Sequence, residues 1–471
     1  MLKRVGGSEE KKNSIIDIKD AVYPNIFNIG LEFNAPVHGT WNIVHIGLLM
    51  PESHQIYVCA DNCMRGVVMT AMEMDYTDNF HSVILYEQDI LKGSLEEETI
   101  EGVSDVIEKL GYHPPVIQIF TVCLHEFLGS DKDYIYRELE KRYPDIVFLR
   151  CFMDPINQRT SYTPEQKLRR AMLECIKPLD IKNNIYVLGC DMPLNKDSYI
   201  HKLAKYYGFN VKEIFDMKTF AEYMEIGDGA LFITNYPTGV LGVSELADRL
   251  GRKFLYLPFS NDTRVIDEQM ETLEYTLRNL SGTGNEGKWD CCATDEELHY
   301  KTIVEVGRNK LENTLMKVKE NFKNTEIAVD YMAHPRPYEL VEFLLDNGLN
   351  VTSIWADTVS EEDKDAFLRL KEKTLKGEYK NIKIYSTIRT EGRVLKSEFV
   401  NENKVVAIGQ KAAWFNETEY FVNQVESGGL IGYEGMCLLL EKMIEAINNK
   451  KDLHDIVPRK AIGHCSNCAI V

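Results

Sequence analysis

Cysteines are the residues of this 471-residue chain whose spacing most directly suggests chemistry. Cys59 and Cys63 stand in a Cys-x-x-x-Cys arrangement, and Cys123 follows an apolar run at 116–120. Thiolates are soft ligands that suit iron–sulfur clusters. The chain has 11 cysteines, an odd number, so complete internal disulfide pairing is impossible. A disulfide-stapled secreted scaffold would also need a much denser set.

These cysteines follow predicted strands, which would place them at one edge of a sheet. A short strand at 55–58 leads into a helix at 64–74, with Cys59 and Cys63 between or near them, and Cys123 follows the strand at 116–120. Carboxyl ends of parallel strands are the edge where open α/β sheets bind ligands, so the three thiols are expected to converge there. A fourth ligand would come from a second chain or from one side chain of the set Asp61, His125 and Glu126. The spacing also fits small core residues on a helix, so both interpretations stay open.

A second pair lies near the end of the sequence. Cys465 and Cys468 form a Cys-x-x-Cys, which suits a redox dithiol or half of a metal site. No second Cys-x-x-Cys occurs to complete a zinc site. The remaining cysteines are interpreted as core or loop residues: Cys151, Cys175, Cys190, Cys291, Cys292 and Cys437.

Short β-branched runs alternate with amphipathic stretches along most of the chain, which indicates parallel α/β structure. Further strands are predicted at 146–149, 185–188, 231–234, 254–257, 326–330, 351–355, 382–385 and 405–408. Helices are predicted at 133–142, 164–176, 198–207, 240–250, 295–322, 337–347, 361–373 and 433–448. The expected fold class is α/β, with three similar Rossmann-like blocks of parallel sheet flanked by helices. The predicted domains are 1–180 with the cluster-binding cysteines, 181–280, 281–450 with a linker helix, and a tail at 451–471.

Composition narrows the class of protein. Acidic residues outnumber basic ones by 73 to 54, a net charge of −19, which argues against a broad grip on nucleic acid. No run of 18 apolar residues occurs, and the first residues lack the apolar stretch of a signal peptide. We therefore expect a soluble, cytoplasmic protein with reduced thiols that binds neither membranes nor nucleic acid.

Several segments match a known family. Ala35-Pro36-Val37-His38-Gly39-Thr40, the segment from Phe120 to Asp131, and Gly432-Tyr433-Glu434-Gly435 occur in the family's order and spacing. On these segments the chain resembles component 1 of the nitrogenase superfamily over about residues 20–450. It departs from the family's first cluster cysteine, where Ile43 stands, and its segment 57–66 is similar to a nitrogenase-like branch of unassigned substrate.

The resemblance implies an oxidoreductase subunit whose Cys59, Cys63 and Cys123 bind an interface iron–sulfur cluster, either 4Fe–4S or larger. It also implies an oxygen-sensitive protein of anaerobic conditions. Electrons would come from a separate iron-protein ATPase, and a second component 1-like subunit or a second copy would complete the oligomer. The chain has no Walker A motif of its own, because the glycine-rich segment 282–288 lacks that spacing.

Substrate, or a second metallocofactor of unknown kind, is expected among the three blocks at the carboxyl ends of strands. His334 could donate a proton there and Arg336 could bind an anionic group. Turns at 235–239 and 355–357 occupy equivalent positions, although their residues are also ordinary turn formers. No convincing counterpart of the residues that anchor nitrogenase's catalytic cofactor is found, which makes dinitrogen an unexpected substrate.

Two other functions fit the same residues. One is a scaffold on which a metallocofactor is assembled or transferred, with Cys465 and Cys468 delivering metal. The other is a metal-free protein whose three blocks close on a small molecule. The metal-free protein should be colourless after strictly anaerobic isolation, whereas a bound cluster would give brown absorbance.

Overall fold

The computed structural model describes residues 14–27, 43–73, 75–153, 162–282, 299–388 and 404–453. Within these ranges the strands form three sheets, with orders β3-β2-β4-β5, β7-β6-β8-β9 and β1-β12-β11-β10-β13-β14. All neighbouring strands run parallel except β1, which is antiparallel to β12. The predicted α/β class, with parallel sheets flanked by helices, is confirmed. We call the three units the first, middle and third blocks.

The first block contains the sheet that the predicted cluster cysteines follow. Its strands are β2 (Ser53–Cys59), β3 (Phe80–Ile84), β4 (Val116–Val122) and β5 (Val147–Met153). Its helices are α2 (Ile43–Leu48), α3 (Asp61–Glu73), α4 (Glu87–Lys92), α5 (Leu95–Leu110), α6 (Cys123–Phe127) and α7 (Lys132–Arg142). Every residue of β2 and β4 is buried, as expected for central strands of a parallel sheet with both faces covered.

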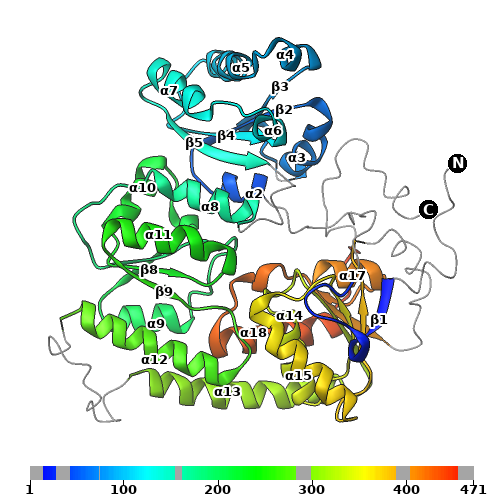
Figure 1. The fold of residues 1–471 in the computed structure, drawn as a ribbon. Coiled ribbons are helices and arrows are strands. Elements are labelled where there is room, and N and C mark those ends of the chain that lie inside the picture. Colours follow the sequence, from blue (N-terminus) through cyan, green and yellow to red (C-terminus); the bar gives the residue numbers. More distant parts are fainter. Residues whose placement is uncertain are drawn as a thin grey trace, which may run out of the picture.

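The middle block is smaller. Its strands are β6 (Asn184–Val187), β7 (Asn210–Glu213), β8 (Leu231–Thr234) and β9 (Lys253–Tyr256). Its helices are α9 (Tyr199–Tyr206), α10 (Phe220–Met224), α11 (Val240–Leu250) and α12 (Thr263–Leu280). Helix α8 (Pro164–Glu174) packs on both β5 and α11 and so joins the first block to the middle one (Figure 1).

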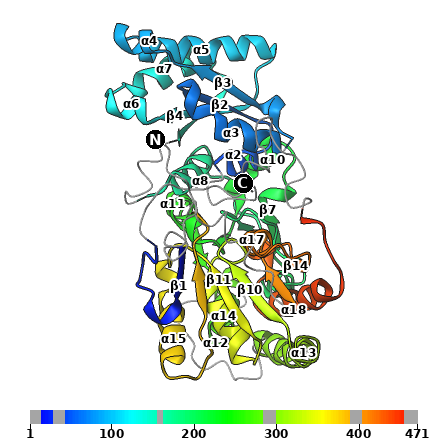
Figure 2. The ribbon, with the colours of Figure 1, turned by 90° about the vertical axis from the view of Figure 1, so that its right-hand side faces the viewer.

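The third block carries the largest sheet. Its strands are β1 (Ile15–Asp17), β10 (Glu326–Asp330), β11 (Val351–Trp355), β12 (Lys383–Tyr385), β13 (Val405–Ile408) and β14 (Phe421–Val422). Its helices are α14 (Pro337–Asp346), α15 (Lys364–Leu375), α17 (Gln410–Asn416) and α18 (Gly432–Asn448). The long helix α13 (His299–Asn321) packs against α12 and α18, and two views place it at the opposite end of the molecule from the first block (Figures 1 and 2).

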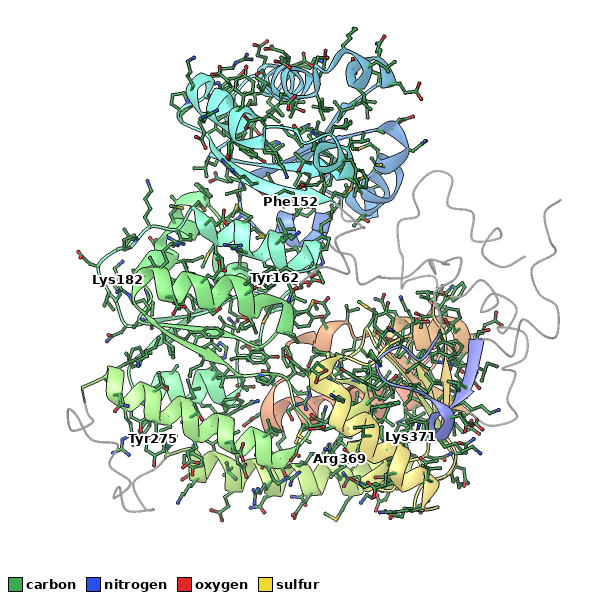
Figure 3. The ribbon with its side chains drawn as sticks, in the orientation of Figure 1. Phe152, Tyr162, Lys182, Tyr275, Arg369 and Lys371 are labelled. Carbon is green, nitrogen blue, oxygen red and sulfur yellow. The ribbon has the colours of Figure 1, made fainter. Side chains whose placement is uncertain are left out.

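The middle block shares a core with each neighbour. One buried apolar cluster combines residues of the first and middle blocks, and another combines residues of the middle and third blocks. Phe152 near the end of β5 and Tyr162 just before α8 lie where the first and middle blocks adjoin (Figure 3). The middle block is therefore packed against both neighbours through buried apolar side chains.

Two sequence predictions can be compared with this arrangement. The boundaries at 180, 280 and 450 remain predictions, although β1 lies within the predicted first domain and pairs with the third sheet. None of the described helices combines the length and apolar composition that crossing a bilayer requires.

Candidate functional site

Cys59 is the last residue of β2 and belongs to the apolar core. Its Sγ lies 2.9 Å from Sδ of Met64, which the first turns of α3 bring over the end of the strand. Burial raises the pKa of Cys59 to about 12, and the neighbouring Cys63 and Asp61 raise it further. Cys59 is thus a neutral thiol at neutral pH in the protein as described.

Cys63 and Cys123 lie at the surface of the same sheet edge. Cys63 is exposed in the first turn of α3, and Cys123 is partly exposed as the first residue of α6. Strands β2 and β4 are paired neighbours, so the segments that follow them emerge side by side. Burial raises the pKa of Cys63, and Cys123 contributes to the same shift, which shows that the two thiols are close.

The candidate fourth ligands are differently placed. His125 is fully buried: its Nδ1 accepts a hydrogen bond from the Val122 amide at 3.3 Å, and its Nε2 lies 3.4 Å from Oγ1 of Thr99. Burial lowers the pKa of His125 to about 4. Glu126 forms an ion pair with Lys132, and Asp61 is exposed.

The three thiols do not form a closed metal site within one chain. In the described part of the molecule, no group of three or more His, Cys, Asp or Glu side chains has a geometry that could hold a metal ion. Two surface thiols with a third behind them instead fit a cluster shared with a second chain, because such clusters usually take four protein ligands. The roles of Cys59, Cys63 and Cys123 therefore remain predictions.

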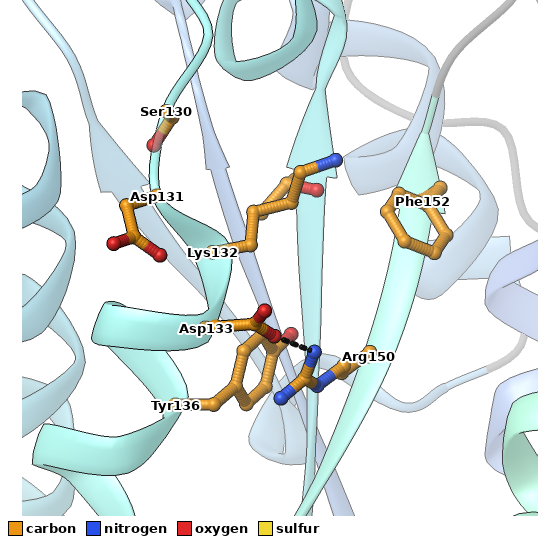
Figure 4. A pocket seen from close by; sticks show the side chains of 8 residues that line it. Ser130, Asp131, Lys132, Asp133, Tyr136, Arg150 and Phe152 are labelled. Atoms are coloured by element: carbon orange, nitrogen blue, oxygen red, sulfur yellow. Dashed lines mark hydrogen bonds and ion pairs between the residues drawn. The ribbon is translucent and has the colours of Figure 1, made fainter.

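A cavity of about 330 Å³ lies beside this edge (Figure 4). Arg150 on β5 donates a hydrogen bond to Asp133 at 2.5 Å, and the Lys132 ammonium stands 5.0 Å from the centre of the Phe152 ring. Both cations of the cavity are thus already neutralised by carboxylates, since Lys132 pairs with Glu126. Phe127, the last residue of the helix that begins at Cys123, is 70% exposed and the following Leu128 is 51% exposed, so two large apolar side chains face solvent at this edge.

A second polar site lies inside the molecule, where the blocks meet. Arg169 on α8 donates to Asp191 at 2.6 Å and to Glu165 at 3.0 Å. Asp191 comes shortly after β6, and Thr238, after β8, donates to Glu165 at 2.7 Å. Glu426, after β14, approaches Asp191 from the third block. We call Glu165, Arg169, Asp191, Thr238 and Glu426 the junction cluster.

Burial controls the charges of the junction cluster. It raises the pKa of Glu426 well above its usual range, and the adjacent Asp191 carboxylate raises it further. Burial, the largest single effect, acts in the same direction on Asp191. The Arg169 guanidinium, His45 and the hydrogen bond with Glu426 together outweigh it, and the pKa of Asp191 is lowered. Burial also raises the pKa of Glu165. These pKa shifts favour a protonated Glu426 beside an ionised Asp191.

His334 and Arg336, the predicted substrate-binding residues, lie elsewhere at the edge of the third sheet. His334 is 4% exposed, and its Nδ1 accepts from the Arg336 amide at 3.0 Å. Burial lowers the pKa of His334 to about 3, so it is neutral at physiological pH. Arg336 pairs with Glu339 at 2.6 Å, and Glu339 also accepts from Ser260 at 2.8 Å. This geometry holds the start of α14 in place; the catalytic roles of both residues remain predictions.

Comparison with known proteins decides the family. The family of nitrogenase component 1 type oxidoreductases matches residues 46–448. The chain belongs to this family. The sequence-based resemblance to the nitrogenase component 1 superfamily is confirmed.

Solved structures support the same fold. "Nitrogenase Cp1 at pH 6.5" aligns over 91% of this chain and 95% of its own, with a TM-score of 0.59 at 14% identity. "Nitrogenase Cp1 at pH 5" aligns over 93% and 94%, with a TM-score of 0.52 at 11% identity. At such identities the likeness concerns the fold alone. No match was found among curated proteins.

Sequence reasoning reached only Thr238 of the junction cluster in this component 1 type chain, through the turn predicted at 235–239, and missed the four charged residues. Glu165 and Arg169 are spaced i,i+4, a pattern that usually marks an exposed ion pair. Asp191 and Glu426 are far apart in the sequence and meet only through tertiary structure. One signal was present: the Glu-Ser-Gly-Gly segment at 426–429 predicts unusual backbone angles. Cys465 and Cys468 lie outside the described residues.

Proposed function

We propose that this chain is the subunit of a component 1 type oxidoreductase that accepts low-potential electrons at the Cys63–Cys123 edge and uses them to reduce a substrate bound between its blocks. The observation that carries the proposal is the pair of accessible, adjacent thiols at the carboxyl edge of the first sheet. Cys59 stands directly behind them. When bound, an iron–sulfur cluster there would supply one-electron transfer.

The chain's own residues prepare this edge for a shared site. The apolar pair Phe127 and Leu128 leaves a surface that a second component 1-like subunit, or a second copy of this chain, would cover. The partner would supply the ligands that the described part of this chain does not bring together. An iron-protein ATPase is the proposed electron donor, in line with the family.

Iron and sulfide quantitation after strictly anaerobic purification tests this proposal. A Cys63→Ser, Cys123→Ser double variant is expected to lose nearly all iron, and Cys59→Ser to lose part of it. Cys175→Ser is the matched control, because among the described residues the Cys175 thiol donates a hydrogen bond to the Met172 carbonyl, at 3.4 Å, and lies away from the thiol edge. Unchanged iron in the double variant would overturn the cluster assignment.

The scaffold function is a second candidate, favoured by the exposure of Cys63, which a metal-transfer site would need. It predicts that iron moves from this protein to an acceptor apoprotein, and that deletion of residues 460–471 slows the transfer. A subunit that retains its iron in the presence of the acceptor, while oxidising its reductant, is an enzyme and not a scaffold.

A further inference from the structure

Asp191 and Glu426 come from different blocks, and their carboxyl groups face each other within hydrogen-bonding reach. Asp191 is 4% exposed and Glu426 7% exposed. Oδ2 of Asp191 and Oε2 of Glu426 are buried and have no hydrogen-bond partner among the described residues. Two ionised carboxylates in contact would offer only acceptors to each other.

A bound proton resolves this arrangement, and a metal ion does not. A carboxylic acid donates one hydrogen bond to a carboxylate, as in enzyme sites where two carboxyl groups share a proton. A metal ion would need further ligands, and the described groups of this chain do not provide a set with the right geometry. The proton is therefore the ligand that the pair fits.

The backbone holds Glu426 in this position at a local cost. Glu426 and Ser427 have φ angles of 49° and 64°, in the left-handed region that non-glycine residues rarely adopt. Their amides donate to the carbonyls of Met332 at 2.6 Å and Ala333 at 2.8 Å, which ties the turn to the segment after β10. Strain of this kind persists where the surrounding structure over-determines it, and it concentrates at functional sites.

Charged groups on the described elements around the pair act on it. Arg169 and Glu165 face it from α8, and His45 faces it from α2. The Tyr236 ring, after β8, stands 5.7 Å from the Arg169 guanidinium. With Arg169 already bonded to Glu165 and Asp191, the cluster holds more acidic than basic groups, and this excess favours retention of a proton.

We propose that Asp191 and Glu426 hold one exchangeable proton between them and that Glu426 is the acid that protonates a substrate reduced between the blocks. This inference rests on the proposed function for the supply of electrons. Asp191, Thr238 and Glu426 all follow strands at their carboxyl ends, the edge where α/β sheets bind ligands. For each pair of electrons from the reduced iron protein, Glu426 gives one proton to the substrate, and solvent supplies the second proton and then reprotonates Glu426.

Infrared spectroscopy of the full-length protein tests the shared proton. At neutral pH the wild type is expected to show a protonated carboxyl band that shifts with ¹³C-labelled glutamate and moves within seconds of transfer into D₂O. Glu426→Gln keeps a hydrogen-bond donor for Asp191 but removes the acid, so this band disappears. Glu342→Gln is the control, because Glu342 is buried and paired with Arg369 away from the junction. A spectrum that is the same in Glu426→Gln and wild type would overturn the proposal, as would a band that resists exchange for hours.

Hydrogen formation tests proton delivery, with titanium(III) citrate as electron donor and protons as the acceptor. Glu426→Gln is expected to take up electrons as wild type does and to form hydrogen about 100-fold more slowly, the lower range for loss of a general acid. Equal rates of hydrogen formation in both proteins would overturn proton delivery by Glu426 and leave the proposed function standing. Electron uptake by the wild type without hydrogen formation would do the same. A wild type that takes up no electrons would instead overturn the proposed function.

Discussion

The thiol edge of the first block and the junction cluster are both built at carboxyl ends of parallel strands, but they are completed differently. At the thiol edge, Cys63 is exposed and Cys123 partly exposed, beside the exposed Phe127 and Leu128. At the junction, Arg169 and Asp191 are almost completely buried and bonded to each other. The first arrangement needs another molecule to complete it, whereas the second is completed by the chain's own three blocks. An edge of a sheet becomes an interface or an interior according to what packs over it.

The largest expected effect concerns thiol reactivity within the thiol edge, where an exposed cysteine stands in front of a buried one. In metal-free protein, Cys63 should react with iodoacetamide at least about 100-fold faster than Cys59, because thiolate is the reactive form and burial raises the pKa of Cys59 to about 12. Mass spectrometry of peptides after timed quenching measures both rates. Comparable labelling of Cys59 and Cys63 would mean that Cys59 becomes accessible to reagent in solution. The Cys63→Ser variant is the control, because it should lose the rapidly labelled site.

The junction should be the more sensitive region for stability. Arg169→Ala leaves buried carboxylates without their counter-charge, so the free energy of unfolding should fall by about 3–5 kcal/mol. Arg369→Ala removes an arginine whose side chain is 43% exposed on α15 and leaves its partner Glu342 paired with Lys373 at 3.2 Å. It should therefore cost no more than about 1 kcal/mol (Figure 3). Urea unfolding at neutral pH measures both. Similar losses in the two variants would show that the junction charges are solvated.

The junction should also give stability a dependence on pH. Glu426 has its pKa raised in the folded protein by burial and by Asp191, so the folded state holds this proton more tightly than the unfolded state. Its contribution is complete below the ordinary range of a glutamate and is lost as the pH rises through the folded pKa. Glu426→Gln should therefore flatten the decline of the urea midpoint as the pH rises above the ordinary range of a glutamate. An identical decline in wild type and variant would locate the titrating group elsewhere.

The smallest effect on subunit stability is expected at the apolar rim of the thiol edge. Phe127→Ser and Leu128→Ser should each change the free energy of unfolding by no more than about 0.5 kcal/mol, since both side chains are already exposed. Association with a second subunit should nevertheless weaken, as measured by analytical ultracentrifugation. Leu91→Ser on α4 is the control, because Leu91 is 86% exposed but lies away from the thiols in sequence. Loss of association in the control as well would place the interface elsewhere.

Hydrophobic runs predicted central strands well and edge strands poorly. The strands predicted at 231–234, 326–330, 351–355 and 405–408 have the observed bounds. Strands β1, β3, β7 and β14 were not predicted, and each lies at the edge of its sheet. Strand β7 has the sequence Asn-Val-Lys-Glu, which contains no apolar run, and only its Glu213 is buried. An edge strand is defined by its partner more than by its own composition.

The candidate site residues also fall into those that the sequence could predict and those that depend on tertiary packing. Cys63 and Cys123 could be predicted to lie together because each follows a strand of one parallel sheet, and adjacent strands deliver their successors to one edge. The Asp191–Glu426 pair could not be predicted, because it depends on how the middle and third blocks pack. The i,i+4 spacing of Glu165 and Arg169 pointed to solvent, whereas α8 is enclosed between blocks.

The pairing of β1 with β12 has a consequence for how the chain reaches its fold. Ile15 lies opposite Tyr385, so β1 must wait for a partner strand that is synthesised much later than β1 itself. Closing so long a loop is slow, because its entropy is lost before the contacts form. The first and middle blocks can therefore fold during translation with this arm still free. The third sheet acquires β1 as an outer strand only after β12 has been synthesised.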